Sequence, residues 1–241
     1  MKKHFNWTNV RIVLLLGVMV FLYAFTSYRN GNRNLIKSEV FFIDENGAFI
    51  EHETVNKLLI ENNTDVKSIK KVEVNLNKLE KSVNSNPMIE RSEVYLGIDG
   101  VLKAKVKQKN PIARVFNEKS SFYIDYKGNK MPLSDKFTAR VPIVLGEINK
   151  EFKDEFQKLL QFVYNDDFLK KNIIGIQIYS NGSIRMQNRS FDFVIEFGKA
   201  QNIETKFNNY KAFFQKTTAD NSISKYKNIN LIFTQQVVGT K

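Results

Sequence analysis

Histidine, cysteine and paired carboxylates carry most enzymatic acid-base and nucleophilic chemistry, and this chain has few of them. Its 241 residues include no cysteine and only two histidines, His4 and His52. The lack of cysteine excludes a thiol nucleophile, a thiolate metal site and a disulfide framework. With two histidines in the whole sequence, a Ser-His-Asp triad or a two-histidine metal site has very few candidate residues. We expect no catalytic residue, no metal ligand and no cofactor-binding residue.

The most obvious acidic pair is Asp166 with Asp167. A cell-wall hydrolase needs two carboxylates that converge on one bond, and adjacent residues rarely do so. The pair is more simply the end of a helix. The sequence also contains no glycine-rich phosphate loop and no metal-ligand spacing. We predict that the chain is not an enzyme, with a membrane-anchored cell-wall hydrolase as the alternative.

A net charge of +12 requires nucleic acid and anionic lipid to be considered as partners. Lys103, Lys105 and Lys107 alternate along a predicted strand, which places their ammonium groups on one face. No aromatic residue interleaves with them for base stacking. A solvated strand face explains them better, since lysine on such a face also discourages edge-to-edge aggregation. We predict no nucleic-acid partner and no small-molecule substrate.

An apolar segment near the N-terminus is long enough to span a membrane. Residues 12–28 read IVLLLGVMVFLYAFTSY and contain no charge. As a helix they reach ~25 Å, and the longer stretch 7–28 reaches ~31 Å, against a hydrocarbon core of ~30 Å. Trp7 and Tyr28 supply aromatic residues for the two interfaces, and Arg11 can snorkel toward the head. A cleaved signal peptide is the alternative, but its cleavage site would be poorly marked.

The basic residues on the two sides of this segment are nearly equal in number, so they say little about its orientation. The head, residues 1–11, is too short to carry a domain, and a large C-terminal body after an export signal is the commoner arrangement. We therefore predict an uncleaved anchor with a cytoplasmic N-terminus and an exported remainder. Residues 29–34, RNGNRN, are polar and predict a short spacer.

The region after the spacer predicts a compact unit of one strand, two helices and a β-hairpin. The strand covers residues 36–43 and closes with the turn-like residues 44–47. Asn75 is a candidate N-cap of the second helix, and the hairpin turns at Asp99-Gly100. The positions that mark the two helical faces are Val55, Leu58, Leu59 and Asn62 in the first helix, and Leu76, Leu79 and Val83 in the second.

The last part of the chain predicts short strands with two longer helices among them. The helices are marked by stripes of Phe152, Phe156, Leu159, Leu160 and Val163 and of Phe207, Tyr210 and Phe214. The predicted strands are residues 111–116, 122–125, 131–133, 141–146, 173–179, 183–186, 191–197 and 229–238.

Several stretches, taken in order, resemble a known family. They are VNLNKLEKSVNSNP from residue 74, VYLGIDGVLKAKV from 94, NPIARVF from 110, YIDYKGNKMPLS from 123, VPIVLG from 141, FGKAQNIETKFNNYKAFF from 197 and INLIFTQQVV from 229. Their order and spacing resemble the FtsQ/DivIB family of cell-division proteins, particularly its versions from Bacteroidetes-like bacteria. The resemblance covers the anchor and both following domains.

The resemblance implies an α+β fold with a single N-terminal transmembrane helix, a POTRA domain in β-α-α-β-β order and a mainly antiparallel β domain with flanking helices. The expected boundaries are a cytoplasmic head at 1–11, a transmembrane helix at 12–28, a spacer at 29–34, a POTRA domain at 35–108 and a β domain at 109–241.

The resemblance also implies a function. It implies a non-enzymatic divisome scaffold of the bacterial inner membrane, single-pass, with periplasmic C-terminal domains and enrichment at the division septum. The implied partners are FtsB/DivIC-type and FtsL-type membrane proteins and other divisome proteins, so that the scaffold links early and late division proteins during septum formation. Another POTRA-containing transport or assembly factor is a further alternative.

In this family the terminal strand receives a strand from the FtsB-type partner, and residues 229–238 suit such pairing because both faces carry apolar side chains. A central strand buried on both sides is the alternative. Where family members often carry an acidic residue and an arginine, this chain has Asn230 and Ile232. The expected partner-binding residues are Tyr226, Leu231, Ile232, Phe233, Thr234, Gln235, Val237 and Val238.

Overall fold

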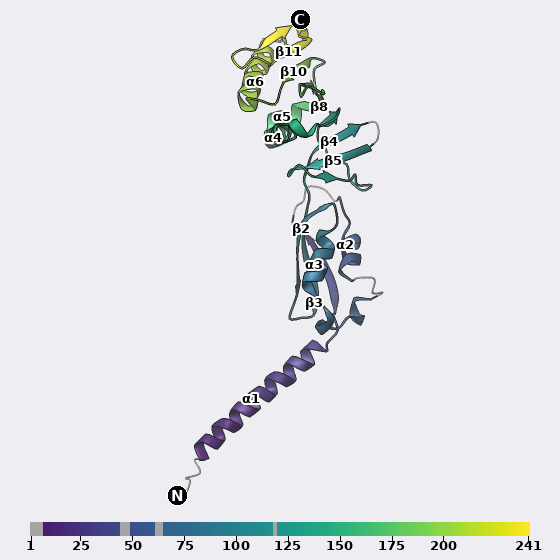
Figure 1. The fold of residues 1–241 in the computed structure, drawn as a ribbon, viewed down its shortest axis with the longest axis vertical. Coiled ribbons are helices and arrows are strands. Elements are labelled where there is room, and N and C mark those ends of the chain that lie inside the picture. The colour runs from purple at the N-terminus through teal and green to yellow at the C-terminus, as the bar shows by residue number, and fades with distance from the viewer. Residues whose placement is uncertain (1–6, 44–48, 61–64, 118–119) are drawn as a thin grey trace. The chain divides into compact units, whose positions relative to one another are not determined.

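The computed structural model describes residues 7–43, 49–60, 65–117 and 120–241. These residues form two compact units (Figure 1). The first contains the described residues up to 43 and from 50 to 108, and the second contains Phe49 and the described residues from 109 onward. The predicted turn at 44–47, Asn62 and the first part of the predicted head lie outside the described residues.

The apolar N-terminal segment forms one helix, α1, Trp7–Gly31, of which no residue is buried by the rest of the chain. Its 25 residues correspond to ~37 Å at the usual rise, more than the ~30 Å hydrocarbon core of a bilayer. By length and composition, α1 is the one helix in the described part of the chain that can cross a membrane. It continues through Gly31, so only residues 32–34 of the predicted spacer lie beyond it.

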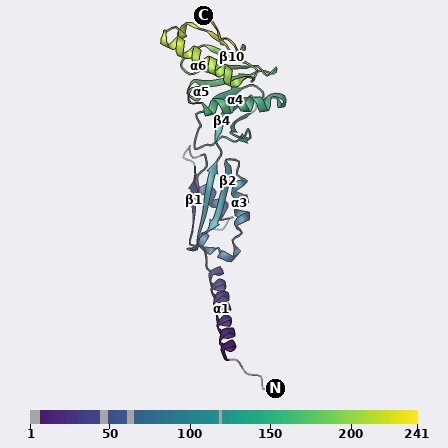
Figure 2. The ribbon, with the colours of Figure 1, turned by 90° about the vertical axis from the view of Figure 1, so that its left-hand side faces the viewer.

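The rest of the first unit is a three-stranded sheet with two helices on one face. The central strand β3 is parallel to β1 and antiparallel to β2, and α3 packs along β2 (Figure 2). The predicted order of strand, helix, helix, strand and strand is confirmed. The elements are β1 Lys37–Phe42, α2 His52–Leu59, η1 Val66–Ser68, η2 Lys71–Glu73, α3 Leu76–Asn84, β2 Ile89–Leu96 and β3 Val101–Gln108.

Local sequence explains where two of these elements begin. The side chain of Asn75 accepts a hydrogen bond of 3.0 Å from Lys78 N and so caps α3, as predicted. Gly100 has φ +86° in the turn between β2 and β3, a conformation that side chains with a Cβ rarely adopt. The buried residues that form the core of this unit under α2 and α3 include Val55, Leu59, Leu79, Val83, Leu102, Ala104 and Val106.

The three lysines of β3 alternate with its buried residues and lie on the face away from the helices. Lys107 pairs with Glu90 at 3.2 Å, and Lys105 Nζ lies 5.6 Å from the centre of the Tyr95 ring. These neighbours are ordinary cross-strand contacts of a solvated sheet face.

The second unit contains a mixed sheet of nine strands in the order β12-β11-β10-β9-β8-β7-β4-β5-β6. Five of the adjacent pairs are antiparallel, and the pairs β4 with β7, β7 with β8 and β10 with β11 are parallel. The strands are β4 Pro111–Asn117, β5 Ser120–Asp125, β6 Lys130–Met131, β7 Ile143–Leu145, β8 Ile173–Ile178, β9 Ile184–Asn188, β10 Val194–Gly198, β11 Asn228–Asn230 and β12 Val238–Thr240.

Three helices lie together over one face of this sheet (Figure 1). They are α4 Lys153–Asn165, α5 Asp167–Asn172 and α6 Ile203–Ala219, with 3₁₀ turns η3 Lys150–Phe152 and η4 Ile223–Lys225. The predicted stripe on α4 is buried from Phe156 onward, whereas Phe152 lies in the preceding turn and is half-buried. The mainly antiparallel sheet with flanking helices confirms the predicted α+β class.

Asp166 ends α4, as predicted, and it also begins α5, which the sequence reasoning missed. Its side chain accepts a hydrogen bond of 3.0 Å from Leu169 N and forms an ion pair with Lys211 of α6. Burial by itself would raise the pKa of Asp166, but the contacts with Lys211 and the backbone N–H groups outweigh it and lower the pKa. The acidic pair is thus a junction between helices.

At the β6 end of the sheet, the chain covers the face opposite the helices with its own residues. Tyr123 of β5 is 1% exposed and Phe49 is 4% exposed. The Phe49 ring lies edge-on to the rings of Tyr123 and Phe137, with centroids 6.2 and 5.0 Å apart. Tyr123 Oη accepts a hydrogen bond of 3.1 Å from Ala139 N, and Ser134 Oγ donates one of 2.7 Å to the Phe49 carbonyl. The helix-free face at the β6 end of the sheet is therefore covered by the chain itself.

Candidate partner-binding edge

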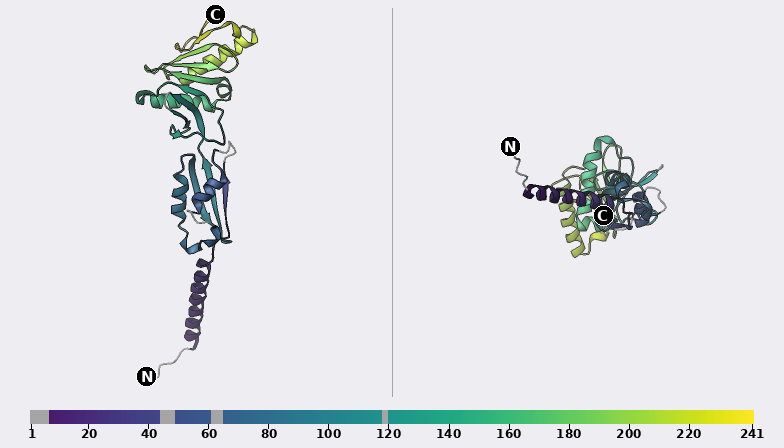
Figure 3. Two further views of the ribbon diagram at one scale, coloured as in Figure 1. Left: turned by 90° about the vertical axis from the view of Figure 1, so that its right-hand side faces the viewer. Right: turned by 90° about the horizontal axis from the view of Figure 1, so that it is seen from below.

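The other end of the sheet is formed by the last two strands. β11 is parallel to β10 and antiparallel to β12, and β12 has β11 as its one strand neighbour among the described residues. The C-terminus lies next to β11, at the same end of the unit as α6 (Figures 1 and 3). The predicted continuous strand at 229–238 is wrong. β11 ends at Asn230, and a loop of residues 231–237 leads to β12.

The side chain of Asn230 explains this break. Its Oδ1 accepts a hydrogen bond of 2.8 Å from Ile232 N, a local bond that turns the chain away from the strand direction. Leu231 N still donates to the Glu196 carbonyl at 2.8 Å, which extends the pairing with β10 by one residue. Asn209 Nδ2 of α6 donates to the Thr234 carbonyl at 2.8 Å. The loop is therefore fixed to α6, and the free edge is shortened to β12.

Tyr226 supports β12 from the side of α6. A Cβ on Gly239 would lie 2.6 Å from Tyr226 Cε1, so the ring rests against the backbone of β12 where a larger residue would displace it. The ring of Phe213 lies edge-on to Tyr226 at 5.1 Å, and Lys241 Nζ lies 5.7 Å from the Tyr226 ring centre. Half-buried Tyr226 thus positions the edge strand.

The expected partner-binding residues differ widely in exposure. Phe233, Ile232 and Val238 are 54%, 49% and 41% exposed, which is high for large apolar side chains. Gln235 is exposed, while Thr234 and Val237 are half-buried. Leu231 is 1% exposed and belongs to the core under α4 and α6. The exposed members of the set lie in the loop and on β12.

A buried lysine holds the turn on which Ile232 rests. Lys206 of α6 is 4% exposed, and its Nζ donates to the carbonyls of Phe197 and Lys199 at 2.9 and 3.0 Å. Burial lowers the pKa of Lys206. Gly198 lies within that turn at φ +71°, and a Cβ there would lie 3.1 Å from Ile232 Cγ1. The exposed loop therefore packs at Ile232 against a turn that the buried Lys206 holds in place.

Sequence reasoning missed a charged pair that shares the helix-free face of the sheet with β12. Arg185 of β9 pairs with Glu196 of β10 at 3.1 Å, and the register continues from Glu196 to Asn230 and from Asn230 to Val238. The Arg185 guanidinium lies 5.5 Å from the centre of the Tyr179 ring. The alternation of β9 and β10 was the available signal, but it could not show which strands are neighbours.

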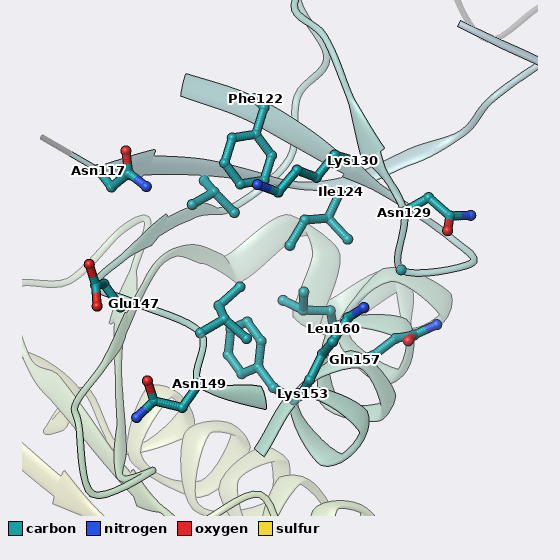
Figure 4. Close-up of a pocket in the computed structure, with 15 residues that line it drawn as sticks. Asn117, Phe122, Ile124, Asn129, Lys130, Glu147, Asn149, Lys153, Gln157 and Leu160 are labelled. Carbon is teal, nitrogen blue, oxygen red and sulfur yellow. The ribbon is translucent and has the colours of Figure 1, made fainter. Parts of the chain in front are cut away.

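A separate pocket of about 510 Å³ lies between β4, β5 and the first turns of α4 (Figure 4). Phe122, Ile124 and Leu160 form part of its apolar wall, and Lys130 and Lys153 lie at its rim (Figure 4). No predicted site residue lies in it. Among its described lining residues there is no histidine, serine or tyrosine. In the described part of the chain, no group of three or more His, Asp or Glu side chains could hold a metal ion.

Comparisons with known proteins identify both units. A family model described as "FtsQ/DivIB, C-terminal related" matches residues 110–240, more than half of the chain. The chain belongs to the FtsQ/DivIB family. A POTRA-like domain model matches residues 40–107, in the first unit. The family resemblance and the POTRA-like fold predicted from the sequence are therefore confirmed.

The search of solved structures matched the major extracytoplasmic domain of the trans isomer of the cell division protein DivIB from Geobacillus stearothermophilus. Sequence identity is 12%, the TM-score is 0.30, and the match covers 48% of this chain and 97% of that chain. A similarity at this level does not assign a role to any individual residue of this chain. The search of curated proteins found no match.

Membership of the FtsQ/DivIB family gives the chain a role in cell division and in interactions among division proteins. The single apolar helix α1 fits a single-pass membrane protein of this family. The candidate edge at β12 lies inside the region that the family model matches.

Proposed function

We propose that the chain is a non-enzymatic divisome scaffold that binds FtsB/DivIC-type and FtsL-type membrane proteins at β12 and the loop 231–237. One observation carries this proposal: β12 pairs with β11 alone among the described strands, and Phe233, Ile232 and Val238 are exposed beside it. A partner segment that adds as a further strand gains main-chain hydrogen bonds from the edge and side-chain specificity from the apolar residues.

The proposed topology follows the sequence prediction. α1 lies in the inner membrane with the N-terminus in the cytoplasm, and both units are periplasmic and enriched at the septum. In this position the scaffold links early division proteins to late ones. The family membership and the single spanning helix support this arrangement.

Main-chain pairing is too weak to hold the partner by itself. A three-residue edge accommodates roughly two to four main-chain hydrogen bonds. At ~0.5 to 1.5 kcal/mol each, they contribute on the order of 1 to 6 kcal/mol, while association costs ~4 to 15 kcal/mol. Apolar burial of the exposed side chains must supply part of the difference. Anchoring of both proteins in one membrane supplies more by raising the effective concentration.

Site-specific crosslinking in cells tests the proposal, because the chain contains no cysteine. Phe233→Cys or Val238→Cys, introduced singly into the full chain, is expected to crosslink to a small membrane division protein through a thiol-reactive bifunctional reagent. Phe116→Cys is the matched control, since Phe116 of β4 is 54% exposed, as is Phe233. Equal crosslinking from residues 116 and 233, or a division partner captured from 116 alone, would contradict the proposal.

A further inference from the structure

Three apolar side chains of the first unit are exposed close to one another. Ile98 is 98% exposed, Val72 70% and Ile36 54%. Ile36 N donates to the Gly100 carbonyl at 2.9 Å, so Ile36 lies against the turn that carries Ile98. Lys71 Nζ donates to the Ile98 carbonyl at 3.0 Å, which brings η2, and with it Val72, to the same turn. Exposed apolar residues that lie together, unlike ones that are scattered singly, mark sites of contact with other proteins or with membranes.

This cluster of Ile36, Val72 and Ile98 is tied to the end of the membrane helix. A Cβ on Gly31, the last residue of α1, would lie 3.7 Å from Val72 Cβ. Lys71 N donates to the Arg33 carbonyl at 2.9 Å. Ile36 follows Gly31 by five residues, a span of at most ~18 Å even when extended. The cluster therefore stays near the surface of any bilayer that α1 spans.

Basic residues are in moderate excess in the segments that carry the cluster and the end of α1. Lys37 pairs with Glu39 at 2.5 Å and Lys70 lies 4.0 Å from Glu73. Asp65 and Asp99 each accept a hydrogen bond from a backbone N–H. The basic residues of this region are Arg29, Arg33, Lys37, Lys67, Lys70 and Lys71, and the acidic ones are Glu39, Asp65, Glu73 and Asp99. The surplus of positive charge suits anionic lipid headgroups.

We propose that Ile36, Val72 and Ile98 insert into the headgroup region of the bilayer that α1 spans, and that the surrounding basic residues bind anionic lipid there. Weak interfacial affinity suffices, because α1 already holds the cluster at the surface. The contact orients the POTRA-like unit on the membrane. It involves no partner protein, so it does not depend on the function proposed for β12.

A fluorescence experiment on the full chain in nanodiscs tests this contact. The absence of native cysteine allows an environment-sensitive dye to be placed singly at Ile98→Cys. Arg91→Cys on β2 is the matched control, because it is exposed on the same hairpin and lies seven residues away, ~23 Å along the strand. In phosphatidylcholine discs containing phosphatidylglycerol, spin-labelled lipid is expected to quench the dye at residue 98 roughly threefold more than the dye at 91. Equal quenching at the two positions would overturn the proposal.

A second variant separates insertion of the cluster from affinity of the dye for lipid. In the Ile98→Cys background, Val72→Asp places a carboxylate in the proposed interface and is expected to reduce quenching to the level at residue 91. Ile143→Asp, at a 48% exposed site on β7, is expected to leave it unchanged. Undiminished quenching with Val72→Asp would show that the dye reports its own partitioning and would overturn the proposal.

Discussion

The two ends of the nine-stranded sheet differ in whether the chain covers the apolar residues that lie there. At the β6 end, Phe49 and the segment after β6 cover the apolar side chains of the helix-free face, so that Tyr123 is 1% exposed. At the β12 end, Phe233 and Val238 remain 54% and 41% exposed. Unpaired strand edges with apolar neighbours favour association, so proteins usually cover or charge them.

The uncovered end is also held in place by side-chain contacts. Asn209 fixes the loop 231–237, Tyr226 supports Gly239, and Lys206 holds the turn beneath Ile232. A merely frayed terminus would show no such contacts. The chain therefore holds an exposed apolar edge in a defined shape, which reduces the ordering cost for a partner.

Removing the β12 end entirely should give the largest effect. Deletion of residues 233–241 removes β12 and most of the exposed apolar surface, so we expect pull-down of the FtsB/DivIC-type partner to fall to background. The first unit has its own core and is expected to keep the hydrogen exchange protection of the full chain. Pull-down at full strength from the truncated chain would show that the partner binds elsewhere.

Emptying the covered end should instead affect stability. Phe49→Ala removes a 4% exposed ring from contacts with Tyr123 and Phe137. We expect it to lower the free energy of unfolding of the second unit by ~3 to 5 kcal/mol, measured by urea denaturation. Partner affinity of the folded protein is expected to stay the same. A comparable loss of affinity would mean that the two ends are not independent.

Gly239→Ala tests the support beneath the exposed edge. The new Cβ would stand 2.6 Å from Tyr226 Cε1, so the ring or the strand must move. Such overpacking costs ~1 to 3 kcal/mol, and we expect a loss of partner affinity together with the loss of stability. Titration calorimetry and thermal melts measure the two effects. Unchanged affinity and stability in Gly239→Ala would show that the Tyr226 ring does not hold β12 in place.

Phe233→Ala removes an exposed side chain and little packing. We expect partner affinity to fall about tenfold, equivalent to ~1.4 kcal/mol, while the free energy of unfolding changes by less than ~0.5 kcal/mol. Phe116→Ala, equally exposed at 54%, should leave affinity unchanged. Equal losses of stability and affinity for Phe233→Ala would favour a buried, structural role for this residue.

The smallest expected effect lies between the two ends, at Asp166. Asp166→Asn keeps a residue that caps helices well but loses the ion pair with Lys211. We expect a loss of ~0.2 to 1 kcal/mol at neutral pH. The folded-state pKa of Asp166 lies below its ordinary value of 3.8, so the stabilisation is present above that value and is lost as the pH falls through the lower one. In urea melts at neutral pH, the wild type should therefore be more stable than Asp166→Asn. In acid, the free energies of unfolding of the two proteins should converge.

Local sequence determined most of the elements. The cap at Asn75, the Asp99-Gly100 turn, the apolar stripe of α4 and the long apolar run of α1 each depend on residues within a few positions of one another. Helix periodicity, capping and turn conformation are local properties, so they could be predicted without knowledge of the fold. The order of the sequence motifs along the chain then indicated the FtsQ/DivIB family.

The terminal edge could be predicted only in part. Phe233, Val238 and Leu231 were all expected to bind the partner, but Leu231 is core whereas the other two are exposed. The alternation at 229–238 also predicted one strand where Asn230 turns the chain. A run of alternating residues fits a strand or a hairpin equally well until a side chain such as Asn230 has a fixed partner.

Neighbouring residues therefore predicted the kind and order of most elements, but not α5 and not the break between β11 and β12. The tertiary structure decided which strand lies at the rim of the sheet, that Arg185 and Glu196 stand in register with Val238, and that Lys206 and Tyr226 serve as supports. Strand order joins β7 to β4 and β8 and joins β11 to β10 across long stretches of chain. Such pairings depend on burial of the whole helix-covered face, which no short segment encodes.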